Sequence, residues 1–270
     1  MKSTAWAKVT SDKILTHLES YLFPKLGANP IGSIKAQEVL ETLRAVEKNG
    51  AVYTATRLRE VCGQIFRFAI ATGRAAYNPV ADLKGALSNP VVTHRPALTE
   101  RKDFAGFLRA LKSYGSAAPV TLLATRFAML TFVRSQELRF AKWEEIDSEA
   151  NEWKVPARRM KVGKTLQSHT VPLSQQAIET LAKLKQLTGD CPYLFPSSHG
   201  ADRVISENTI GYLLNKMGYK DRQTLHGFRA SARSLLSERG WSTAALERQL
   251  DHAERNKVVA AYARSERPPS

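Results

Sequence analysis

Apolar residues recur at helical spacing over most of the chain. Over residues 5–87 the helical stretches are separated by turn signals that include Pro24, Gly50 and Gly73. Within this region, residues 51–71 place apolar side chains three and four positions apart, which is the spacing of one helix face. We therefore predict a small, all-helical domain at the start of the chain.

A linker follows this helical region. The run over residues 85–98, GALSNPVVTHRPAL, contains two prolines and has no clear period, as expected for an exposed connection between domains. We predict a first domain over residues 1–88, a linker over 89–97 and a second domain over 98–270.

Helical patterns dominate the second domain as well. Thr99 is a predicted N-cap for a helix that runs to about Ser113, and residues 120–133 are apolar enough to form a buried helix. Three serines, Ser174, Ser206 and Ser242, are predicted N-caps of later helices. The later helices are expected over residues 174–187, 206–217, 225–238, 242–250 and 256–265.

One segment of the second domain reads as strands. Residues 153–156 and 169–173 are rich in β-forming residues, and a polar segment containing Gly163 lies between them. The fold class is thus predicted as mainly α with a small antiparallel β-sheet.

The charge of the chain narrows the range of partners. Lys and Arg outnumber Asp and Glu by 40 to 25, a formal net charge of +15, which favours a polyanion. No apolar run is long enough to span a bilayer, and the first residues lack the apolar core of a secretion signal, so we expect no membrane partner. Cys62 and Cys191 give neither a disulfide framework nor metal-ligand spacing. We expect a cytoplasmic protein.

The second domain contains side chains suited to phosphodiester transfer without a metal ion. Such chemistry needs a nucleophile, positive charge at the phosphate and an acid for the departing oxygen. No carboxylate cluster resembles a two-metal nuclease. The candidate residues are Arg134, Lys161, His226, Arg229, His252 and Tyr262.

Sequence context supports several of these candidates. Arg134 directly follows the predicted buried helix, and Glu137 is placed to orient it. His226 and Arg229 are three residues apart at the start of a helix, an arrangement that suits a phosphate. Taken singly, each residue has an ordinary alternative: a tyrosine on an amphipathic helix, such as Tyr262, is usually packed or simply exposed.

Several segments together resemble the tyrosine recombinases, specifically the P4-like integrases of phages and genomic islands. They are TFVRSQELR around Arg134, ARRMK before Lys161, HTVPLSQQA after it, LHGFRASARSLL around Arg229, and ERQLDHAERNKVVAAYARSE around Tyr262. The resemblance covers almost the whole chain. It implies a helical SAM-like core-binding domain followed by an α+β catalytic domain, without the N-terminal arm-binding domain of a full-length integrase.

The resemblance also implies roles for the candidate residues. The side chains implied to surround the scissile phosphate are Arg134, His226, Arg229 and His252. Tyr262 would attack the phosphate, leaving a 3'-phosphotyrosine and a free 5'-hydroxyl, and Lys161 would protonate the leaving oxygen. Lys164 is the alternative general acid, because its spacing from Pro172 is nearer to the usual hairpin spacing of the family.

The expected partner is double-stranded DNA at attachment sites, bound by a homotetramer, with DNA-bending and directionality proteins as accessory partners. Arg57, Arg59, Arg67 and Lys164 are candidate phosphate contacts, although a solvated helix face is the ordinary interpretation of each. The chemistry needs no cofactor and no metal. Such a protein would associate with the nucleoid.

Two departures from the family pattern keep alternatives open. Asp251 stands where the family commonly has a small residue, which puts a carboxylate beside the cationic residues. The family's longer C-terminal tail is also missing. A DNA-binding integrase remnant with impaired cleavage, or a strand transferase similar to type IB topoisomerases, are therefore the competing interpretations.

Overall fold

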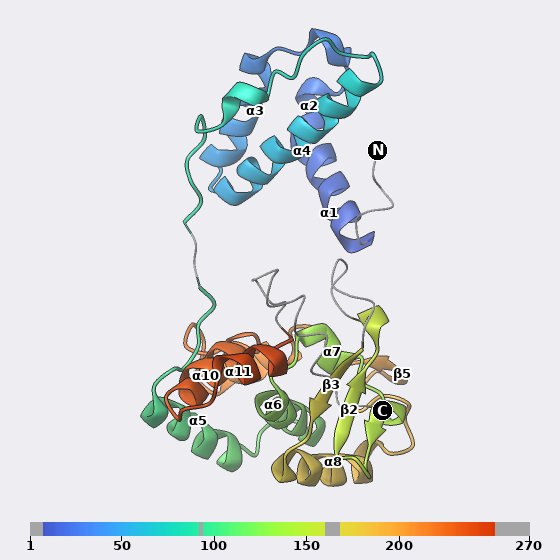
Figure 1. Ribbon diagram of the computed structural model, residues 1–270, viewed down its shortest axis with the longest axis vertical. Helices are drawn as coiled ribbons and strands as arrows, with labels where there is room; N and C mark the ends of the chain where they lie inside the picture. Colours follow the sequence, from blue (N-terminus) through green and yellow to red (C-terminus); the bar gives the residue numbers. More distant parts are fainter. Residues whose placement is uncertain (1–7, 92–93, 160–167, 252–270) are drawn as a thin grey trace. The chain divides into compact units, whose positions relative to one another are not determined.

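The chain divides into two compact units, residues 1–93 and 94–270, each with its own hydrophobic core (Figure 1). This computed structural model describes residues 8–91, 94–159 and 168–251.

Every secondary-structure element in the described residues of the N-terminal unit is a helix. Buried Leu43 and Leu58 belong to its core, because α3 packs along α4. Its elements are α1 (Lys8–His17), the π-helical turn η2 (Leu18–Leu22), α2 (Phe23–Leu26), η3 (Ile31–Ser33), α3 (Ala36–Lys48), α4 (Val52–Ala71) and η4 (Ala81–Leu83). The predicted helix over residues 51–71 is α4.

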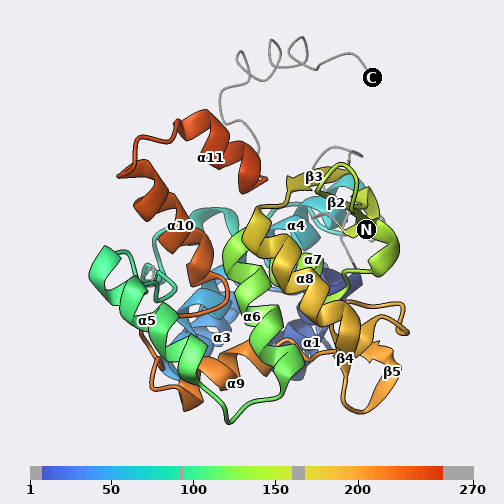
Figure 2. The ribbon, with the colours of Figure 1, turned by 90° about the horizontal axis from the view of Figure 1, so that it is seen from below.

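The C-terminal unit is built around α6, which contacts α8, α9 and α10 (Figure 2). Phe127 of α6 packs between Trp153 and Phe195, with ring centroids 5.6 and 5.9 Å away. The helices are α5 (Arg101–Ser113), α6 (Pro119–Thr131), α7 (Ser135–Arg139), η5 (Trp143–Glu145), η6 (Ala157–Arg159), α8 (Gln175–Thr188), α9 (Thr209–Lys216), α10 (Gly227–Ser237) and α11 (Thr243–Gln249).

Two small antiparallel sheets complete this unit. The first has the order β1 (Ile146–Asp147), β2 (Glu152–Val155), β3 (His169–Pro172), in the register Trp153 opposite Val171. It contains the two predicted strands, so the mainly α class with a small antiparallel sheet is confirmed. The second sheet pairs β4 (Pro196–Ser197) with β5 (Gly200–Val204), and the sequence pattern did not predict it.

Two of the predicted serine caps are confirmed. The hydroxyl of Ser174 accepts from the Ala177 main-chain N–H at 3.3 Å, and that of Ser242 accepts from the Ala245 N–H at 3.2 Å. These bonds satisfy main-chain donors that the first turn of a helix leaves without a partner. They fix the starts of α8 and α11.

Two other predicted caps are wrong. The helix expected after Thr99 begins at Arg101, with Glu100 at the N-cap position. The helix expected at Ser206 begins at Thr209, with Asn208 at the N-cap position, and the Ser206 hydroxyl pairs with the Thr209 hydroxyl at 3.0 Å. The helix predicted over residues 256–265 lies outside the described residues.

Candidate active site

The first candidate arginine stands where two helices of the C-terminal unit meet. Helix α6 ends at Thr131, the φ of 57° at the next residue, Phe132, turns the chain sharply, and α7 starts at Ser135. Arg134 occupies the N-cap position of α7. The carboxylate of Glu137 accepts from the Arg134 main-chain N–H at 2.8 Å, which caps the helix start and fixes the backbone of the arginine.

The guanidinium of Arg134 is held by two acidic residues. Its Nη1 donates to Glu137 Oε1 at 2.7 Å and to Asp251 Oδ2 at 2.6 Å, and its Nη2 donates to the Asp251 main-chain oxygen at 2.8 Å. Burial opposes the charged form of Arg134, but these hydrogen bonds outweigh burial and raise its pKa above the usual value. Arg134 is therefore a permanent cation, as a phosphate site requires.

The second candidate arginine is buried. Arg229 lies in the first turn of α10, and 5% of it is exposed. Its Nη1 donates to the Phe132 carbonyl at 2.5 Å and its Nη2 donates to the Leu250 carbonyl. Burial, and then the nearby charge of Arg134, lower the pKa of Arg229 to about 10, so it still carries its charge at neutral pH.

The two arginines meet at the end of α11. Arg229 binds the carbonyl oxygen of Leu250 and Arg134 binds that of the next residue, Asp251. Leu250 is the C-cap residue of α11 and Asp251 directly follows it, so both carbonyls lie just past the end of the helix. The bonds bring two guanidinium groups together, although Arg134 and Arg229 lie far apart in the sequence.

His226 faces a hollow beside Arg134. It occupies the N-cap position of α10 and is exposed, unlike Arg229. The hollow has a volume of about 460 Å³. Its lining includes Arg95, Arg134, Glu137, Arg159, Glu207, Asn208, Thr224 and His226. Two guanidinium groups besides Arg134, those of Arg95 and Arg159, thus border the same space.

The segment before α5 is pinned against the start of α10. The Thr224 hydroxyl donates to the Pro96 carbonyl at 3.2 Å and accepts from the Gly227 N–H at 2.9 Å. The side chain of Gln223 accepts from the Leu98 N–H at 2.7 Å. These bonds place Arg95 at the edge of the hollow.

Sequence reasoning assigned no role to Arg159. Its Nη2 donates to the Glu145 carboxylate and its Nη1 donates to the Glu137 main-chain oxygen at 3.3 Å. Burial lowers its pKa. Its place in ARRMK, two residues before Lys161, was the available signal.

A histidine on β3 was also missed. His169 is half-buried, and burial lowers its pKa; the charges that act on it are those of Asp251, Glu137 and Arg134. It therefore belongs to the same charged cluster. Its place at the start of the predicted strand HTVP was visible in the sequence, but a strand position carries no sign of proximity to Arg134.

The remaining predicted site residues lie outside the described part of the chain. They are Lys161, Lys164, His252 and Tyr262. The structure thus brings together Arg134, Glu137, Arg229 and, at the hollow, His226.

The arginines predicted to contact DNA lie on α4 of the N-terminal unit. Arg57 forms an exposed ion pair with Glu60 at 2.6 Å, and Arg59 donates to the Leu83 carbonyl at 3.3 Å. Arg59, Arg67 and Lys84 line one open hollow of about 340 Å³. Two of the three predicted arginines therefore share a basic surface.

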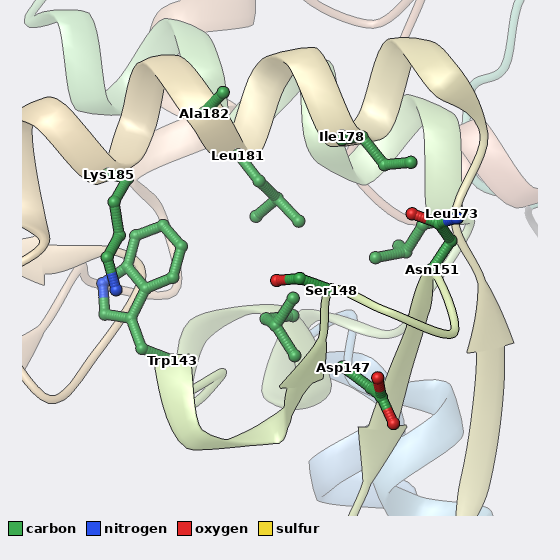
Figure 3. Close-up of a pocket in the computed structure, with 10 residues that line it drawn as sticks. Trp143, Asp147, Ser148, Asn151, Leu173, Ile178, Leu181, Ala182 and Lys185 are labelled. Carbon is green, nitrogen blue, oxygen red and sulfur yellow. The ribbon is translucent and has the colours of Figure 1, made fainter.

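A second hollow of the C-terminal unit has different chemistry (Figure 3). It lies between α8 and the β1–β2 hairpin, and aliphatic side chains such as Leu181 and Ile178 point into it. Its charged groups are already engaged: Lys185 lies 4.6 Å from the ring centroid of Trp143, and Asp147 pairs with Lys154 at 2.8 Å. Among the described residues, the linings of this hollow and of the arginine hollow have none in common.

Within residues 8–91, 94–159 and 168–251, no group of three or more His, Cys, Asp or Glu side chains is arranged to hold a metal ion. Among the helices of the same residues, none has the length and apolar character needed to cross a membrane.

Comparison with protein families gives two matches that together cover most of the chain. Residues 1–86 match the phage integrase central domain, and residues 99–267 match the phage integrase family.

Curated relatives match nearly the whole chain. The integrase of Enterobacteria phage P4 is 40% identical over 269 residues, which is 95% of this chain and 61% of the relative. The prophage integrase IntS of Escherichia coli K12 is 31% identical over 262 residues, covering 97% of this chain and 67% of the relative. The chain thus spans about three fifths of the length of the P4 integrase.

Solved structures share the fold. A lambda integrase tetramer bound to a Holliday junction matches with a TM-score of 0.72 and 21% identity, over 94% of this chain and 74% of that one. The Tn1549 transposon integrase in complex with transposon right end DNA matches with a TM-score of 0.75 and 15% identity, over 98% and 95%.

Proposed function

Because the chain belongs to the phage integrase family, we propose that it is a site-specific DNA recombinase that integrates or excises a phage or genomic island. The observation that carries this proposal is the pair of guanidinium groups, Arg134 and Arg229, bound to consecutive carbonyls beside a hollow lined by His226. Paired guanidinium groups bind phosphate oxygens in a fixed geometry and stay charged at any physiological pH.

In the proposed reaction, the Tyr262 hydroxyl releases its proton to solvent as its oxygen attacks the scissile phosphorus. The new bond joins phosphorus to the tyrosine oxygen, and the bond that breaks joins phosphorus to the 5'-oxygen of the next nucleotide. That oxygen takes a proton from Lys161, or from Lys164 as the alternative. The products are a 3'-phosphotyrosine and a free 5'-hydroxyl, and attack by a partner strand's 5'-hydroxyl reverses the step without ATP.

The other site residues act on the phosphate in this proposal. Arg134 and Arg229 stabilise the charge that develops on its oxygens, Glu137 orients Arg134, and His226 and His252 contribute further donors. The bonds from Arg134 and Arg229 to the end of α11 support this role of the two arginines, because donors that are already fixed need no reorganisation during the reaction.

The proposed partner is a double-stranded attachment site, gripped by both domains. Domain 1–88 would contact DNA phosphates with Arg59 and Arg67, which share a hollow with Lys84. Arg57 would attract the DNA through its positive charge.

We extend the proposal to a homotetramer, supported by the similarity to the lambda integrase tetramer bound to a Holliday junction. DNA-bending and directionality proteins are proposed accessory partners, and the nucleoid in the cytoplasm is the proposed location.

The test is covalent capture of DNA. The protein is incubated with a labelled, nicked duplex that carries a core attachment site, and a denaturation-resistant protein–DNA band is sought. Tyr262→Phe should abolish the band and leave DNA binding intact. Tyr212→Phe, at a tyrosine of α9 that is 62% exposed, is the matched control and should keep the band.

Other outcomes would overturn the proposal. A band that persists in Tyr262→Phe excludes that nucleophile. Tight binding without any band indicates a DNA-binding remnant of the family. Relaxation of supercoiled plasmid without recombinant products indicates a topoisomerase-like strand transferase.

A further inference from the structure

Asp251 places a second carboxylate on the guanidinium of Arg134. Its Oδ2 lies 2.6 Å from Nη1, while Glu137 Oε1 lies 2.7 Å from the same nitrogen. Two carboxylates therefore stand against the two cations Arg134 and Arg229, and the formal charges of these four residues cancel. A site meant to attract a phosphate would be more strongly positive without one of these carboxylates.

The two carboxylates differ in what they do for the fold. Glu137 is 3% exposed at its side chain and also accepts from the Arg134 main-chain N–H, so it is part of the α7 cap. The side chain of Asp251 is 24% exposed. The main-chain carbonyl of Asp251 also accepts a hydrogen bond from Arg134, and any residue at this position supplies that carbonyl.

The backbone at Asp251 also does not call for aspartate. Its φ is 47°, in the left-handed region that glycine adopts most readily just after a helix. Asparagine tolerates the same conformation. Replacement of Asp251 by asparagine thus suits the backbone geometry and removes the negative charge, whereas replacement by glycine suits the backbone geometry and removes the whole side chain.

A phosphate still has donors to bind on Arg134. In its contacts with the described residues, the guanidinium uses both hydrogens of Nη1 and one of Nη2. The Nε–H and the second Nη2 hydrogen remain, and together they form the side-on fork that binds two phosphate oxygens. Asp251 would remain beside a phosphate held in this way.

We propose that Asp251 is an affinity-determining residue that weakens the hold of this site on phosphate, by opposing the charge of Arg134 with a solvent-accessible carboxylate. The inference rests on the proposed function only where it is tested by covalent capture of DNA. The site should therefore bind phosphate more weakly than its two arginines alone would allow. Loss of the Asp251 carboxylate should raise its affinity for phosphate.

The first arm measures covalent capture at sub-saturating nicked DNA. Asp251→Asn should raise the initial capture rate by about tenfold, the effect of removing one opposing charge from a partly buried site. Asp221→Asn is the matched control, because Asp221 is also an aspartate with positive φ (56°), is exposed, and does not line the hollow. Asp221→Asn changes the net charge of the chain by the same amount as Asp251→Asn, and it should alter the initial capture rate less than twofold.

Asp251→Gly is the second variant. It keeps the carbonyl bond and suits the positive φ, so it should fold and should also raise capture. Capture that is unchanged or reduced in both Asp251 variants, relative to Asp221→Asn, would overturn the proposal and make Asp251 a support for Arg134.

The second arm needs no cleavage. Inorganic sulfate is titrated at constant ionic strength while the unfolding temperature is followed, because an anion that binds only the folded state raises that temperature. Asp251→Asn should be stabilised at about tenfold lower sulfate than Asp221→Asn. Adding Arg134→Gln should remove the difference. An equal response of the two single variants refutes the proposal, whereas failure of wild-type capture alone refutes only the proposed function.

Discussion

A Cβ atom on Gly227 would lie 2.2 Å from the main-chain oxygen of Pro96. No side chain fits in that distance, so α10 can begin against the 94–98 segment only if its first residue is glycine. The same contact fixes where His226 and Arg229 stand, because they flank Gly227 at the start of the helix. The packing of the 94–98 segment against Gly227 therefore helps to set the positions of His226 and Arg229.

Gly227→Ala should lower the free energy of unfolding by about 1–3 kcal/mol, because the new methyl group forces the Pro96 main chain to shift. Urea denaturation measures the change. Gly106→Ala is the control within another helix: its nearest atom, on Arg109, is 3.9 Å away, and it should stabilise the protein by about 0.5–1 kcal/mol. Equal stability of the two variants would show that the close approach of Gly227 to Pro96 does not require glycine.

Arg229→Lys should impair both folding and chemistry. An ammonium group has one nitrogen and cannot reach the Phe132 and Leu250 carbonyls as the two Nη atoms do. One unsatisfied carbonyl costs about 1–3 kcal/mol of stability. Loss of the fixed donor should reduce covalent capture by about 10²–10³-fold.

Arg233→Lys is the control for this change. Arg233 lies one turn further along α10, is 55% exposed at its side chain and pairs with Glu247 at 3.1 Å. The substitution there should leave capture and stability nearly unchanged. Similar losses in both variants would mean that α10 needs arginine for a reason other than the two buried bonds.

His169 should make stability depend on pH. Burial lowers its pKa in the folded protein, so as the pH falls below about 6.5 the unfolded chain takes up the proton first. Stability is then lost with falling pH until the folded pKa is passed, and above about 6.5 the residue contributes no pH dependence.

The measurement is the free energy of unfolding in urea at pH 7.5 and pH 5.5. The loss between the two should be smaller in His169→Gln than in the unmodified chain. His199→Gln, at an exposed histidine beside β5, controls for the removal of one histidine. An unchanged loss in His169→Gln would show that burial of this imidazole does not govern the pH response.

The sequence by itself determined most of the secondary structure. Helical periodicity predicted α4, alternation and β-forming residues predicted β2 and β3, and the hydroxyls of Ser174 and Ser242 marked two helix starts. Each of these features depends on residues within a few positions of one another, so a local pattern contains the information. The same local signal failed at Ser206, whose hydroxyl pairs with the Thr209 hydroxyl while Asn208 takes the N-cap position.

Only the tertiary structure decided how the site is assembled. The order of the motifs indicated that Arg134 and Arg229 act together, but not that they bind consecutive carbonyls at the end of α11. The sequence indicated a carboxylate at Asp251 beside the cationic residues, but not that it pairs with Arg134. It gave no sign that His169 shares their charged cluster. These contacts join segments distant in the sequence, and their geometry depends on how α6, α10, α11 and β3 pack rather than on any residue's immediate neighbours.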